Sequence, residues 1–173
     1  ASAAKKAVKD KMKGDPALSD LDSMKSVGEV LAFAFESLVE KKLIEPTIIH
    51  DYPVEVSPLA KKRARDPRFT ERFEGFVFGL EVGNNYSELN DPEDLAQRFI
   101  AEKKKQEAGF QEAHQTDADY LEAIEHGMPP ACGFGIGIDR MAMLLTGTAN
   151  IKEVILFPTL RPKDKDGPHA RVG

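Results

Sequence analysis

Two runs of strand-forming residues, separated by a tight turn within residues 72–89, constrain the fold more than any other feature. Aromatic and aliphatic residues alternate there with polar residues and glycine, and the turn is predicted near residues 77–79. Parallel pairing needs a crossover of about a dozen residues or more, which this short connection does not provide. The hairpin therefore predicts an antiparallel sheet.

Helical signals on both sides of the hairpin complete an α+β pattern, an antiparallel sheet flanked by helices. Ser26 and Glu29 have capping-box spacing, and Asp91 followed by Pro92 is a typical helix start. The helices are expected at residues 26–43, 91–109, 116–126 and 139–145, the last capped by Asp139. Further strands are expected at residues 47–49, as a buried strand, and at 133–138 and 154–157.

The length of the chain fits one hydrophobic core, and its net charge bears on whether it binds nucleic acid. Of 173 residues, we expect 1–25 to form a frayed helix and a loop, and 26–173 to form the main domain. A net charge of −5 argues against a chain that holds nucleic acid mainly by its own basic surface. No apolar run approaches the roughly 20 residues that cross a bilayer, and no secretory signal is visible. The single cysteine, Cys132, points to a reducing cytoplasm.

Glu74 and Glu81 are candidates for a divalent cation site. A hairpin with an even-numbered loop places both on one face, and a two-residue loop at Val77 and Phe78 would place them directly opposite each other. Like charges so opposed are destabilising, and a cation such as Mg²⁺ between them would reverse the effect. The alternative is two exposed glutamates separated by water.

Asn84, Tyr86 and Glu88 fall on one face of the continuing strand because they are two residues apart. Glu81 has the wrong parity to join them unless a β-bulge at Gly83 resets the alternation. An amide, a phenol and a carboxylate on one face suit an amino acid with a cationic end. The alternative is a polar strand that faces solvent.

Residues 133–140 combine a glycine ridge with an arginine. Gly133, Gly135 and Gly137 fall on one strand face, where the close approach of a flat ligand would explain them. Arg140 then stands in the first turn of a helix, where a phosphate is favoured. The spacing is neither a dinucleotide fingerprint nor a phosphate loop. Tight strand-on-helix packing, with Arg140 in a salt bridge, is an equally good explanation.

Three segments together resemble the class II lysyl-tRNA synthetases: residues 46–61, residues 73–92, and residues 133–140 with 155–162. The resemblance implies that Glu74 and Glu81 hold Mg²⁺ with ATP as substrate. It also implies an ATP site made of Glu81, Val82, Gly137, Ile138, Asp139 and Arg140, with Arg140 as the catalytic arginine. The lysine site would be Asn84, Tyr86 and Glu88.

This family activates L-lysine with ATP to lysyl-adenylate and transfers the lysyl group to tRNA(Lys), as a cytoplasmic homodimer. The family's anticodon-reading OB-fold, motif 1 and motif 2 are not found here. We therefore expect the C-terminal part of the catalytic domain, unable to form adenylate alone. Two alternatives are a lysyltransferase paralogue that acts on a protein or lipid, such as the elongation factor P lysyltransferase, and a non-catalytic binding domain.

Overall fold

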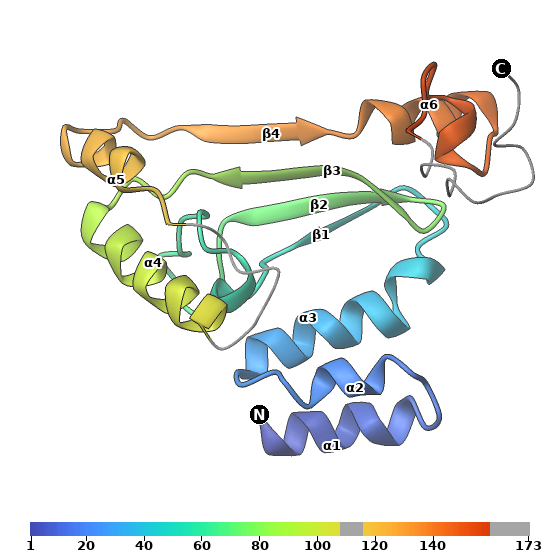
Figure 1. The fold of residues 1–173 in the computed structure, drawn as a ribbon, viewed down its shortest axis with the longest axis horizontal. Coiled ribbons are helices and arrows are strands. Elements are labelled where there is room, and N and C mark those ends of the chain that lie inside the picture. The colour runs from blue at the N-terminus through green and yellow to red at the C-terminus, as the bar shows by residue number, and fades with distance from the viewer. Residues whose placement is uncertain (108–115, 160–173) are drawn as a thin grey trace, which may run out of the picture. The chain divides into compact units, whose positions relative to one another are not determined.

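A four-stranded antiparallel sheet organises the structure, a computed structural model that describes residues 1–107 and 116–159 (Figure 1). Two units divide the chain after Gly137, and the sheet belongs to the first. Its strands follow chain order: β1 (Thr47–His50), β2 (Arg72–Val77), β3 (Leu80–Ser87) and β4 (Cys132–Ile136). The predicted α+β class with an antiparallel sheet is confirmed.

Strand β1 lies at the edge of the sheet and is not the buried strand that its β-branched sequence predicts. Ile48 is 65% exposed, because it points to the sheet face opposite Phe76. Thr47 and Ile49 point to the same face as Phe76 and Glu74. In an antiparallel sheet with one solvent-exposed face, only every second residue of a strand is buried. The β-branched composition of residues 47–49 therefore could not show which of them are buried.

Three helices at the N-terminal end share one core. They are α1 (Ser2–Lys11), α2 (Leu18–Leu21) and α3 (Val27–Leu38). Val8 of α1 and Met12, directly after it, pack in a cluster with Leu21, Val30 and Phe33, so the expected frayed helix is in fact anchored. The division into domains at residue 25 remains a prediction.

Helix α3 begins with the predicted capping box. The Ser26 side chain accepts from the Glu29 backbone N–H at 3.0 Å, and the Glu29 carboxylate accepts from the Ser26 N–H at 2.9 Å. The helix ends at Leu38, before the predicted residue 43, and a 3₁₀ turn, η1 (Glu40–Lys42), follows. Phe35 of α3 packs edge-on against Phe76 of β2, with ring centroids 5.6 Å apart, and so joins the helix to the sheet.

The β2–β3 hairpin turns at Phe78 and Gly79, within the predicted residues 77–79. Both have positive φ, 52° and 71°, as a two-residue type I′ turn requires. The ladder pairs Val77 with Leu80 and then shifts register between Gly75 and Phe76, which leaves Val82 as an extra residue in β3. The predicted bulge therefore exists, and it lies at Val82 rather than at Gly83.

Helices α4 (Pro92–Glu107) and α5 (Ala118–Glu125) lie between β3 and β4 in the chain, as predicted. The Asp91 carboxylate accepts from the backbone N–H groups of Glu93 and Asp94, which confirms it as the α4 cap; the predicted stop at residue 109 lies outside the described residues. Buried Arg98 of α4 donates to the carbonyls of Ser57 and Ala60 at 2.9 and 2.7 Å. None of the described helices is long and apolar enough to cross a membrane.

The second unit, described to residue 159, contains α6 (Ile138–Thr146) and η3 (Ile151–Glu153). Since α6 starts at Ile138, Asp139 lies inside its first turn and is not the predicted cap. The predicted strand at residues 154–157 is wrong. Leu156 and Phe157 are 89% and 92% exposed, and the described part of this unit has no strand with which they could pair.

Replacing Ser26 by alanine removes one half of the capping box and leaves a backbone N–H of α3 without its acceptor. We expect Ser26→Ala to lower the free energy of unfolding by about 1 kcal/mol. Urea denaturation followed by circular dichroism measures it. Ser37→Ala, at an exposed position in the last turn of the same helix, serves as the control and should not destabilise. Equal loss in both variants would contradict a capping role.

Candidate functional site

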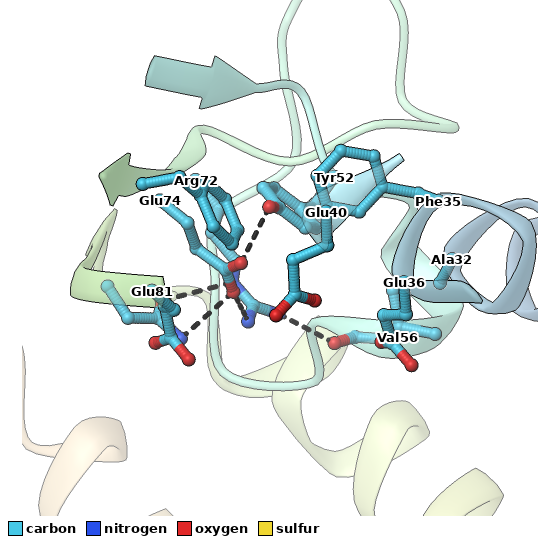
Figure 2. A pocket seen from close by; sticks show the side chains of 11 residues that line it. Ala32, Phe35, Glu36, Glu40, Tyr52, Val56, Arg72, Glu74 and Glu81 are labelled. Carbon is cyan, nitrogen blue, oxygen red and sulfur yellow. Dashed lines mark hydrogen bonds and ion pairs between the residues drawn. The ribbon is translucent and has the colours of Figure 1, made fainter. Parts of the chain in front are cut away.

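A cavity of about 340 Å³ lies between α3 and the face of the sheet that carries Phe76 (Figure 2). Side chains from three parts of the first unit line it. The helical side contributes Ala32, Phe35 and Glu36 of α3 with Glu40 of η1; the connection before β2 contributes Tyr52 and Val56; and the sheet contributes Arg72, Glu74, Phe76, Glu81 and Asn84.

Glu74 is the most enclosed acid of the cavity, with only 8% of the residue exposed. Its carboxylate accepts from the Tyr52 hydroxyl at 2.6 Å and from the Asn84 amide at 3.1 Å, and it pairs with the Arg72 guanidinium. Burial, then the hydrogen bond and charge of Glu74, raise the pKa of Tyr52 well above its usual value. The Tyr52 hydroxyl therefore remains a donor, and Glu74 is held by three donors.

The bulge at Val82 places Asn84 on the face that carries Glu74 and Glu81, so the three side chains share one face, as predicted. Glu81 pairs with Phe76, and Asn84 pairs with Glu74. Cross-strand partners point to one face, so the odd spacing of Glu81 and Asn84 is cancelled by the extra residue. The two glutamates are not directly opposite each other as a turn at Val77 and Phe78 would have made them, because the turn and the bulge both shift the register.

The donor set of the cavity fits a divalent cation that arrives with its own ligands. Among the described residues, no group of three or more His, Cys, Asp or Glu is placed to hold a metal ion. Mg²⁺ is commonly held by one or two carboxylates with substrate phosphates and water, which Glu74 and Glu81 can supply. An ionised carboxylate has about four acceptor positions, so Glu74 keeps one beyond its three donors. Glu74 and Glu81 are thus compatible with the ion, and their role as its ligands remains a prediction.

Tyr86 and Glu88 lie farther along the same face and outside the lining of the cavity. Tyr86 pairs with Arg72 on one side and with Gly133 on the other. A Cβ built on Gly133 would approach the Glu88 carboxylate to 2.6 Å, so this carboxylate lies over the glycine. Burial raises the pKa of Glu88, and burial with the charge of Glu88 raises the pKa of Tyr86 and of Tyr120 in α5.

Strand β4 lies close to β3 at two of its glycines, Gly133 and Gly135, and glycine is needed for a different reason at each. At Gly133 the missing side chain makes room for Glu88, whereas a Cβ on Gly135 would lie 3.2 Å from the Asn84 carbonyl oxygen. The Gly137 N–H donates to the Val82 carbonyl at 3.0 Å, so the bulge residue also holds the end of β4. Gly135 is exposed, and the ridge is therefore not sealed under packed side chains at that position.

The remaining predicted site residues, Ile138, Asp139 and Arg140, begin α6 in the second unit. Arg140 is in the first turn of that helix, as predicted. The roles of these three residues in an ATP site remain predictions.

Sequence reasoning missed four polar side chains that line the cavity: Tyr52, Arg72, Glu36 and Glu40. Arg72 was detectable, because it precedes Glu74 by two residues in the same strand and must share its face. Glu36 and Glu40 are spaced as neighbours on a helix surface, but no sequence signal places that surface against the sheet. Tyr52 sits in a loop, where no periodicity applies. With Glu36 and Glu40, the cavity is lined by four glutamates and one arginine, Arg72.

Comparison with known proteins gives one consistent result. The family model for class II tRNA synthetases (D, K and N) matches residues 4–161. A lysine–tRNA ligase of Pelotomaculum thermopropionicum is 54% identical over 145 residues, which are 84% of this chain and 29% of that protein. The lysine–tRNA ligase of Listeria monocytogenes is 54% identical over 137 residues, 79% of this chain and 28% of that protein. This chain thus spans less than a third of the length of these curated relatives.

A side chain at Gly83 should separate β3 from β4. A Cβ there would lie 3.2 Å from the Gly135 carbonyl oxygen, and φ at Gly83 is not positive, so the close approach rather than the backbone conformation requires glycine. We expect Gly83→Ala to lower, and Gly83→Val to abolish, the hydrogen-exchange protection of the β4 amides, with α1–α3 unchanged. Gly75→Ala is the matched control, since its Cβ would meet only a Val82 methyl at 3.7 Å. Full β4 protection in Gly83→Val would disprove this.

Proposed function

The chain belongs to the class II tRNA synthetases (D, K and N), and on this premise we propose that it forms part of the catalytic site of a lysine–tRNA ligase. The reaction is the ATP-dependent activation of L-lysine to lysyl-adenylate, followed by lysyl transfer to tRNA(Lys). The observation that carries the proposal is the bulge at Val82, which gathers Glu74, Glu81 and Asn84 around one cavity. Relatives named lysine–tRNA ligase at 54% identity support lysine as the amino acid.

Lysine would lie along the face that carries Asn84, Tyr86 and Glu88. The partly buried Glu88 carboxylate would face the side-chain ammonium, and the Tyr86 ring would contact the aliphatic stem. Burial raises the pKa of Glu88 because the ionised carboxylate has lost interactions with water. A bound cation would replace those interactions and so stabilise the ionised form. The carboxylate of lysine would then point toward Asn84 and the cavity.

ATP would bind with its triphosphate at the cavity, where four glutamates surround Arg72. Such a cavity repels a polyphosphate unless cations accompany it, which supports Mg²⁺ as the cofactor. When bound, Mg²⁺ neutralises phosphate charge, and Glu74 and Glu81 would hold it. The backbone of Glu81 and Val82, with Gly137, Ile138, Asp139 and Arg140, would contact the nucleotide. Arg140 would stabilise charge on the phosphates as the lysine carboxylate attacks the α-phosphate and pyrophosphate leaves.

No side chain needs to act as a nucleophile in this reaction, because the lysine carboxylate is itself the attacking group. The residues of this chain would contribute in-line positioning of that carboxylate and exclusion of competing water. The whole protein would be a cytoplasmic homodimer, and a free Cys132 fits that compartment.

Lysine-dependent ATP–pyrophosphate exchange tests the proposed function. We expect activity from a chimera in which the matching segment of the Listeria relative is replaced by this chain, and none from the 173-residue chain by itself. The chimera with Glu81→Gln should lose exchange by about 100-fold or more, since one of the two carboxylates that would hold Mg²⁺ is lost. A folded chimera that exchanges with another amino acid but not with lysine would overturn the proposal.

The pH dependence of lysine binding should follow Glu88. Its pKa lies above the ordinary 4.5, so as pH falls the carboxyl becomes neutral earlier than an exposed glutamate does. We expect lysine affinity, measured by calorimetry with Mg²⁺–ATP, to be full near neutrality and to decline through mildly acidic pH. Glu88→Gln should bind weakly at every pH, without that decline. Glu125→Gln, at an exposed site on α5, is the control and should keep the wild-type profile.

A further inference from the structure

Arg72, at the start of β2, joins three parts of the site through one side chain that is 17% exposed. Its Nη1 donates to the Val56 carbonyl at 2.8 Å and to the Ser57 hydroxyl at 3.0 Å. Its guanidinium also stacks over the Tyr52 ring, 4.7 Å from the centroid. These contacts fix the guanidinium plane from the loop side, independently of the sheet.

The opposite edge of the same guanidinium holds the two groups assigned above to the cation and the amino acid. Nε donates to the Asn84 Oδ1 at 3.1 Å, and Nη2 pairs with the Glu74 Oε1. The Asn84 Nδ2 donates to that same Glu74 oxygen at 3.1 Å. Arg72, Glu74 and Asn84 therefore close a triangle, drawn in part in Figure 2.

This triangle leaves the Asn84 amide one orientation. Its oxygen faces the arginine and its nitrogen faces the carboxylate, because the reverse would set the oxygen against Glu74. An ammonium group cannot replace the guanidinium, since only a planar fork presents Nε and Nη2 side by side while Nη1 points to the loop.

We propose that Arg72 is a positioning residue: it sets the carboxylate of Glu74 and the amide of Asn84 in one arrangement, through which binding of a cation and binding of the amino acid are linked. The linkage rests on the proposed function, whereas the positioning does not. Arg72 itself need not touch either ligand.

The direct test needs no ligand. In the 173-residue chain, we expect the two Asn84 side-chain amide protons to give well-separated NMR signals, because one of them is hydrogen-bonded to Glu74. Arg72→Lys should bring these signals together. Ser57→Ala, which removes one anchor of Arg72 and touches neither Glu74 nor Asn84, should shift them in the same direction by less. Unchanged Asn84 signals in both variants would overturn the proposal.

A matched control separates positioning from general stability. Arg98→Lys also alters a buried arginine that holds the loop near Ser57, but Arg98 contacts neither Glu74 nor Asn84. It should lower the melting temperature and leave the Asn84 signals in place. If Arg98→Lys moved these signals as far as Arg72→Lys, Arg72 would have only a structural role.

Calorimetry with lysine and Mg²⁺–ATP as probes then tests the linkage. Arg72→Lys should weaken both by about tenfold or more, as loss of a supporting partner does at other sites, and Arg98→Lys by less than about twofold. Wild-type affinity for both probes in Arg72→Lys, with the Asn84 signals moved, would disprove the linkage. If the chimera of the Listeria relative that carries the wild-type segment bound neither probe while the Asn84 signals responded as expected, the proposed function would fail and the positioning role of Arg72 would stand.

Discussion

One additional residue in β3 determines which side chains meet in this protein. Without the bulge at Val82, strict alternation would place Glu81 on the sheet face opposite Asn84 and Tyr86. With it, Asn84 and Tyr86 join Glu81 on the face that carries Glu74 and Arg72. The bulge residue also accepts a hydrogen bond from Gly137, so the same irregularity sets the end of the glycine strand. The candidate site depends on this single register shift.

The face so formed buries charges that need partners. Glu74 is nearly inaccessible to solvent, and its interactions with Tyr52, Asn84 and Arg72 offset the loss of water. The same contacts restrict the carboxylate and the amide to one geometry before any ligand arrives. Preorganisation of this kind suits the proposed site, which would hold a polyphosphate and an amino acid in line without a covalent role for the protein.

Local chemistry made part of the fold predictable. The Ser26 capping box, the Asp91 cap and the hairpin depend on residues close in sequence, and the structure contains all three. The prediction of a strand at residues 154–157 was wrong because a strand must pair with a neighbouring strand. The sequence of the segment does not show whether such a neighbour exists. The exposure of Ile48 was missed for a related reason: burial depends on whether another element covers that face.

The sequence by itself determined the family, the antiparallel hairpin and the placement of Glu74 and Glu81 on one face, since strand parity and short-range turns follow from residue order. Only the tertiary structure decided that the bulge lies at Val82, that Glu36 and Glu40 face the sheet, and that Arg72 ties Glu74 to Asn84. These features come from contacts between residues distant along the chain. Periodicity carries no information about such contacts, because it describes an element and not what packs against it.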